Sequence, residues 1–70
     1  MNARDVQFIA DGARMQAQGL RMFVGSIRQT GDACATMQNP KCAALAEVYR
    51  EFARNLEREL QTFERQINDI

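Results

Sequence analysis

Apolar residues recur every three or four positions along two stretches of the chain, which is the pattern of two amphipathic helices. In the first stretch, one column repeats every seventh residue: Val6, Ala13, Leu20 and Ile27, with Ala10, Ala17 and Val24 on one flank and Ile9 and Phe23 on the other. In the second, the column is Cys42, Tyr49, Leu56, Phe63 and Ile70, flanked by Leu45, Phe52, Leu60 and Ile67. We expect the column of the second stretch to face the first helix.

Capping residues predict where each helix begins and ends. Asn2, with Asp5 three residues later, is a suitable N-cap, so the first helix is expected from residue 3. Gly31 is typical of a helix end, which places the last helical residue near Gln29. Asn39 and Pro40 predict the start of a second helix over residues 40–69. Residues 30–39 are then the connection, with room for one helical turn over residues 33–37.

Two helices joined by a short connection pack antiparallel, so the fold class expected is an all-α, coiled-coil-like hairpin forming a single domain over residues 1–70. A chain of this length buries only a small core, and oligomerisation usually contributes to the stability of such domains. We therefore expect the hairpin to form a homodimer, arranged as a four-helix bundle.

The first helix carries a second apolar column, which supports this expectation. Phe8, Met15 and Met22 form the column, and the small residues Gly12, Gly19 and Ser26 separate it from the first column. One partner helix covers roughly a third to a half of another helix's circumference, so the second helix cannot cover both columns. Either a second copy covers this surface or a different protein docks there. The predicted interface consists of Phe8, Gly12, Met15, Gly19, Met22 and Phe23.

Charge gives a weaker indication of a partner. Nine basic and nine acidic residues cancel, and eight of the nine basic residues are arginine. Arg14, Arg21 and Arg28 share one column of the first helix and could contact phosphates or an acidic partner. A more common role for such a column is a solvated edge paired with acidic residues of the second helix, for which Glu59 or Glu47 could serve. Nucleic acid is therefore the less favoured partner.

Candidate chemistry is sparse. The sequence has no histidine, the commonest general base near neutral pH and the commonest zinc ligand, so we expect no enzyme activity, metal or other cofactor. Cys34 and Cys42 fit no common zinc spacing. A disulfide between them is geometrically allowed if their Cα atoms come within about 7 Å. The interpretation we favour is a small core residue at Cys42 and a free thiol at Cys34.

The first twenty residues contain charged residues and no continuous apolar segment, so we expect no signal peptide and no membrane span. The default expectation is then a cytoplasmic location with no membrane partner. The function expected is a protein-binding regulator or adaptor of the inhibitor or chaperone type, which occludes a target protein. Two alternatives remain open. One is an RNA- or DNA-binding bundle that uses the arginine column, and the other is a structural subunit of a larger helical assembly.

Overall fold

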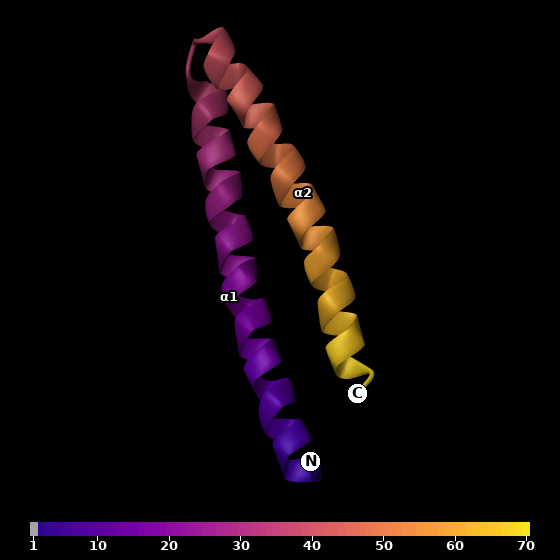
Figure 1. Ribbon diagram of the computed structural model, residues 1–70. Coiled ribbons are helices and arrows are strands. Elements are labelled where there is room, and N and C mark those ends of the chain that lie inside the picture. The colour runs from indigo at the N-terminus through magenta and orange to yellow at the C-terminus, as the bar shows by residue number, and fades with distance from the viewer. Residues whose placement is uncertain (1) are drawn as a thin grey trace.

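The computed structural model describes residues 2–70, and it folds them into two long antiparallel helices (Figure 1). Helix α1 spans Ala3–Thr36, helix α2 spans Pro40–Asn68, and residues 37–39 join them. The hairpin is elongated, with Cα extents of 57 × 15 × 12 Å. The N-terminal end of α1 extends past the C-terminal end of α2 (Figure 1). The all-α helical hairpin expected from the sequence is confirmed.

Both helices begin at the residues that their caps predict. Asn2 Oδ1 accepts a hydrogen bond of 3.0 Å from the backbone N–H of Asp5. Asn39 Oδ1 accepts one of 2.8 Å from the backbone N–H of Lys41, and Pro40 occupies the first helical turn. These bonds satisfy backbone donors that have no partner within the helix. Capping is a local interaction, which is why sequence alone located both starts.

The end predicted for the first helix, near Gln29, is wrong, because α1 continues for another seven residues to Thr36. Gly31 is helical, and no glycine among the described residues has a positive φ. The helix ends instead at Met37, whose backbone N–H donates to the carbonyl of Cys34 at 3.2 Å. The connection is thus residues 37–39 rather than 30–39.

Tertiary packing explains why the helix continues through Gly31. This residue is buried against α2, and a Cβ atom added to it would lie 3.2 Å from Tyr49 Cβ and 3.6 Å from the carbonyl oxygen of Ala46. The absent side chain therefore lets the two helices approach closely near the connection. Gly31 serves as a packing residue here, so the helix-ending role that glycine often has does not apply.

Small residues occupy much of the line along which the helices meet, which we call the seam. Its buried residues are Ala17, Val24, Ile27 and Gly31 of α1 and Ala46, Ala53, Leu60 and Ile67 of α2. Val24, Ile27 and Ala53 form its central cluster, against which Tyr49 and Leu56 pack. In α2 the buried positions repeat every seventh residue, as in a coiled coil.

This seam differs from the columns expected at the contact. Phe63 and Ile70 of α2 were predicted to face the other helix but are exposed, and Val6 and Leu20 of the first apolar column of α1 are exposed as well. The residues that replace them in the seam are the neighbouring, smaller ones, chiefly Ala17, Ala46 and Ala53. Small side chains allow the helix axes to come close, so the bulkier residues lie beside the contact instead of within it.

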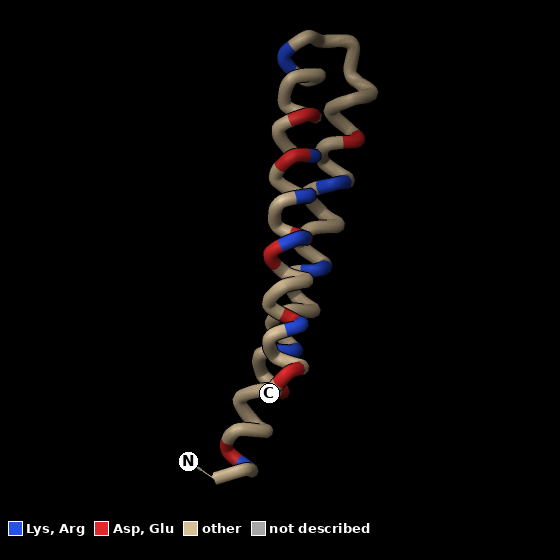
Figure 2. Tube along the Cα trace, turned by 90° about the vertical axis from the view of Figure 1, so that its right-hand side faces the viewer, with Lys and Arg blue, Asp and Glu red and all other residues tan. Residues whose placement is uncertain are grey.

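Charged residues of both signs are interspersed along the hairpin (Figure 2). No side-chain nitrogen or oxygen among the described residues is buried without a hydrogen-bond partner. Within the described residues, neither helix contains a stretch apolar and long enough to cross a membrane.

Candidate protein-binding surface

The two sides of the seam have opposite chemistry. In an antiparallel helix pair, residues that flank the seam on one side of α1 lie opposite residues that flank it on the same side of α2. On one side, the flanking residues are arginines of α1 and glutamates of α2. On the other side, large apolar residues from both helices predominate, with a few polar residues such as Gln16 and Glu59 among them. We call these the polar side and the apolar face.

Ion pairs across the seam define the polar side. Arg21 donates through Nε and Nη2 to the two carboxylate oxygens of Glu64, at 3.2 and 2.5 Å. Arg28 likewise pairs across the seam, with Glu57. Arg14 contacts Asp11 of its own helix at 3.0 Å. The expectation that this arginine column pairs with glutamates of the second helix is correct for Arg21 and Arg28.

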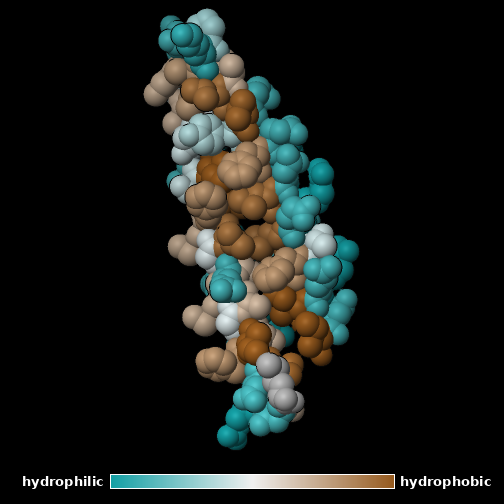
Figure 3. Space-filling view, in the orientation of Figure 1, coloured by the Kyte–Doolittle hydropathy of each residue, from teal (hydrophilic) through white to brown (hydrophobic). Residues whose placement is uncertain are grey.

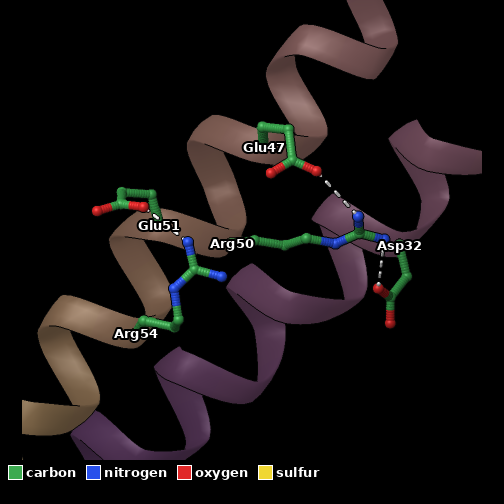
Figure 4. Close-up of polar contacts among 5 residues, drawn as sticks. All are labelled: Asp32, Glu47, Arg50, Glu51 and Arg54. Carbon is green, nitrogen blue, oxygen red and sulfur yellow. Dashed lines mark hydrogen bonds and ion pairs between the residues drawn. The ribbon is translucent and has the colours of Figure 1, made fainter.

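The glutamates named for that pairing, Glu59 and Glu47, were the wrong ones. Glu47 instead pairs with Arg50 at 3.3 Å, and Arg50 also reaches Asp32 of α1 at 3.6 Å, so its guanidinium lies between the two helices (Figure 4). All these groups are at least partly exposed to solvent, where an ion pair contributes about 0–1 kcal/mol to stability. The pairs therefore stabilise the fold only weakly, and they show which residues of the two helices lie opposite each other.

The mixed charges on the outer surface of α2 form pairs within that helix. Arg54 Nη2 lies 2.6 Å from a carboxylate oxygen of Glu51, one turn earlier (Figure 4). Both side chains are more than half exposed. This surface is solvated and offers no apolar area to a partner.

Large apolar side chains gather on the other side of the seam, where Figure 3 shows a continuous brown area over both helices, bordered by teal along α2. The exposed residues that form this apolar face are Val6, Ile9, Leu20 and Phe23 of α1 and Leu45, Val48, Phe52 and Phe63 of α2. A shallow groove of about 290 Å³ lies within it, lined by Leu20, Leu56, Glu59, Leu60 and Phe63. Exposed apolar surface that extends over both helices is typical of an interaction site, so the apolar face is a candidate.

The second apolar column of α1 lies farther around that helix, and we call Phe8, Met15 and Met22 the outer column. Their exposed fractions are 80%, 74% and 74%, so α2 leaves them almost entirely uncovered. Gly12 and Gly19 lie between the outer column and the apolar face, and a Cβ atom added to either would meet nothing within 4 Å. The predicted interface residues Phe8, Gly12, Met15, Gly19, Met22 and Phe23 thus share one exposed surface of α1.

Part of the interaction surface was missed at the sequence level. Leu45 and Phe52 were interpreted as flanks of the buried column of the second helix, but each is about half exposed, and Val48 beside them is more so. A signal was present in the seven-residue repeat of Ala46 and Ala53, because small residues at that spacing indicate a close helix contact. Centring α2 on the alanines places Leu45, Val48 and Phe52 on the apolar face.

A larger hollow lies elsewhere on the hairpin. It measures about 440 Å³ and is lined by Arg14, Ala17, Gln18, Arg21, Glu64, Ile67 and Asn68. Its charged groups are already occupied, because Arg21 is paired with Glu64 and Arg14 with Asp11. The apolar face is therefore the better candidate for a functional surface.

Both cysteines are free thiols and half-buried near the connection. Cys42 Sγ lies 3.6 Å from Met37 Sδ, so its immediate neighbour is a thioether. Among the described residues, no group of three or more potential ligands could hold a metal ion.

No protein-family model matches this chain, and no curated protein or solved structure matches it either. Its function is consequently inferred from the geometry of the hairpin itself.

Proposed function

We propose that this hairpin is a non-enzymatic protein-binding regulator or adaptor, which acts by covering part of a target protein. The observation that carries the proposal is the exposure of the outer column. Phe8, Met15 and Met22 are three of the largest apolar side chains of α1 and among its most exposed, and they lie one above another at two-turn intervals. A rigid helix that presents such a row fits an apolar groove in another protein.

The residue types also suit protein recognition. Methionine has an unbranched, polarisable side chain that adapts to irregular partner surfaces, and phenylalanine supplies a large rigid contact. The outer column begins near the N-terminal end of α1, which extends past α2 and is accessible from several directions (Figure 1). Binding would place a target against α1, and the length of the hairpin would then block access to the covered surface, as an inhibitor or a chaperone does.

The polar side argues against the nucleic-acid alternative. A phosphate-binding surface needs arginines that are free to exchange counterions for phosphates. Arg14, Arg21 and Arg28 instead each have a carboxylate partner within the chain, so the column carries little unbalanced positive charge. We therefore advance protein binding alone.

The proposal is tested with two variants that add the same charge at different places. Met15→Glu/Met22→Glu introduces two carboxylates in the outer column, and Gln18→Glu/Gln61→Glu introduces two at exposed positions on the polar side. Proteins retained by tagged wild type from cells that express it are identified, and each candidate target is then purified and titrated. We expect a target that binds wild type and the control with equal affinity and fails to bind Met15→Glu/Met22→Glu. A target that binds both variants equally would overturn the proposal.

A further inference from the structure

We infer that a second copy of this chain covers the apolar face, with its α1 packed against the α1 described here. This pairing concerns a neighbouring surface and does not depend on the target binding proposed for the outer column. The hairpin itself is unbalanced, because half of the residues buried in the seam are glycine or alanine whereas all four phenylalanines of the chain are exposed. Phe23 and Phe52 remain about half exposed, one on each helix.

Two helices with a narrow seam form a weak core, whereas two such hairpins stacked through one apolar side each form a four-helix bundle with a shared core. This hairpin has the required asymmetry. The polar side is occupied by the Arg21–Glu64 and Arg28–Glu57 pairs, so of the two sides of the seam only the apolar face is free to pack against another apolar surface. One further hairpin is therefore enough to cover the apolar face.

One long side of the hairpin is large enough for a second copy. The Cα trace measures 57 × 15 Å across its two longer dimensions. A rectangle of that size is on the order of 850 Å², and each partner in a stable protein–protein interface typically contributes about 800 Å². The hairpin thus presents, on one side, an area comparable to the one that a stable dimer requires.

The distribution of apolar residues indicates which helices meet. On α1, the apolar face extends over five turns from Val6 to Phe23, with the polar Gln16 in the middle of this stretch. On α2, it holds Leu45, Val48 and Phe52 near the connection, but the equivalent later positions are polar: Asn55, Glu59, Thr62 and Gln66. A symmetric dimer uses the same patch on both copies. Of the two helices, α1 has the longer apolar patch and can contact the same patch of a second copy. The two α1 helices therefore pair, and the α2 helices lie outside them.

The glycines on this surface are consistent with such a pairing. Gly12 and Gly19 lie between Phe23 and the outer column, and each is open to the surface in the single hairpin. Gly25 is equally open but lies on the polar side, in the hollow that Arg21, Arg28 and Glu57 line. In the paired arrangement, Gly19 faces the partner's α1 and Gly25 faces solvent. These two positions therefore serve as a matched pair for an experiment.

The test uses single cysteines in a Cys34→Ser/Cys42→Ser background. Gly19→Cys and Gly25→Cys are oxidised separately, and covalent dimer is quantified on a non-reducing gel. We expect Gly19→Cys to form covalent dimer efficiently and Gly25→Cys to remain monomeric. Equal yields from the two variants, or a higher yield from Gly25→Cys, would overturn the pairing of α1 with α1.

A second measurement keeps the inference testable if a new cysteine disturbs the packing. Phe23→Glu should weaken self-association on the order of 30-fold or more, as the loss of an interface hot spot does. The control Gln18→Glu, on the polar side of α1, should leave the dissociation constant unchanged. Sedimentation across a dilution series measures both variants. Self-association that is unaffected by Phe23→Glu would contradict the inference, and so would a folded wild-type monomer, which would leave the face to a different protein.

Discussion

Replacing Gly31 with alanine tests the packing of the seam near the connection. In the interior of a helix, alanine is more favourable than glycine by about 1 kcal/mol, because glycine loses more backbone freedom on folding. At Gly25 nothing lies within 4 Å of the added Cβ, so Gly25→Ala should raise the free energy of unfolding by about this amount. The free energy of unfolding of Gly25→Ala therefore measures how much alanine stabilises α1 where it makes no new contact.

At Gly31 the same substitution meets the other helix. The added Cβ would lie 3.2 Å from Tyr49 Cβ, 3.6 Å from the carbonyl oxygen of Ala46 and 3.8 Å from Arg50 Cγ. The first two of these atoms are fixed to the backbone of α2, so relief requires the helices to separate by a few tenths of an ångström. Overpacking of this kind costs about 1–3 kcal/mol. After the gain of about 1 kcal/mol is subtracted, Gly31→Ala should be between neutral and about 2 kcal/mol less stable than wild type.

Urea unfolding followed by circular dichroism at the helix band measures both variants, at one protein concentration because self-association contributes to apparent stability. The difference between Gly25→Ala and Gly31→Ala should be about 1–3 kcal/mol, in favour of Gly25→Ala. If Gly31→Ala stabilised the protein as much as Gly25→Ala does, the close approach of α1 and α2 at Tyr49 would be refuted.

Two further variants address the cap and the ion pairs. Asn39→Ala removes the acceptor for the backbone N–H of Lys41 and should lower the free energy of unfolding by about 1 kcal/mol. The control Asn39→Ser keeps a hydrogen-bond acceptor and should retain most of the stability. An unchanged urea midpoint for Asn39→Ala would contradict the capping role. Arg21→Glu places two carboxylates together and should lower the free energy of unfolding by up to about 1 kcal/mol. The charge-swapped variant Arg21→Glu/Glu64→Arg should recover most of this loss. A double variant that is no more stable than Arg21→Glu would argue that the two residues do not pair.

Features set by local chemistry were predictable from the sequence. The N-caps at Asn2 and Asn39 depend on residues within one turn, so both helix starts were located correctly. It was also predictable that one apolar column of α1 stays exposed, because one partner helix cannot cover two columns, but the structure was needed to show that Met15 and Met22 belong to the exposed one.

Features set by the approach of the two helices were not predictable in the same way. Whether Gly31 ends α1 or packs within it depends on Tyr49, which is eighteen positions away in the sequence. The position of the seam likewise depends on how closely the two helix axes approach. Close approach places Ala46 and Ala53 in the seam and leaves larger neighbours such as Phe52 beside it. The pairing of Arg21 with Glu64 follows from that same alignment of the helices.

The exposed apolar side of this hairpin is, in our account, an interaction surface that a second copy covers. The most direct test is the molar mass of the wild-type protein in solution, measured by light scattering after size exclusion across a dilution series, with reductant present to prevent disulfides. We predict a mass twice the 8.0 kDa of the chain, maintained into the low-micromolar range. A mass of 8.0 kDa for a protein that is fully helical under the same conditions would contradict this account.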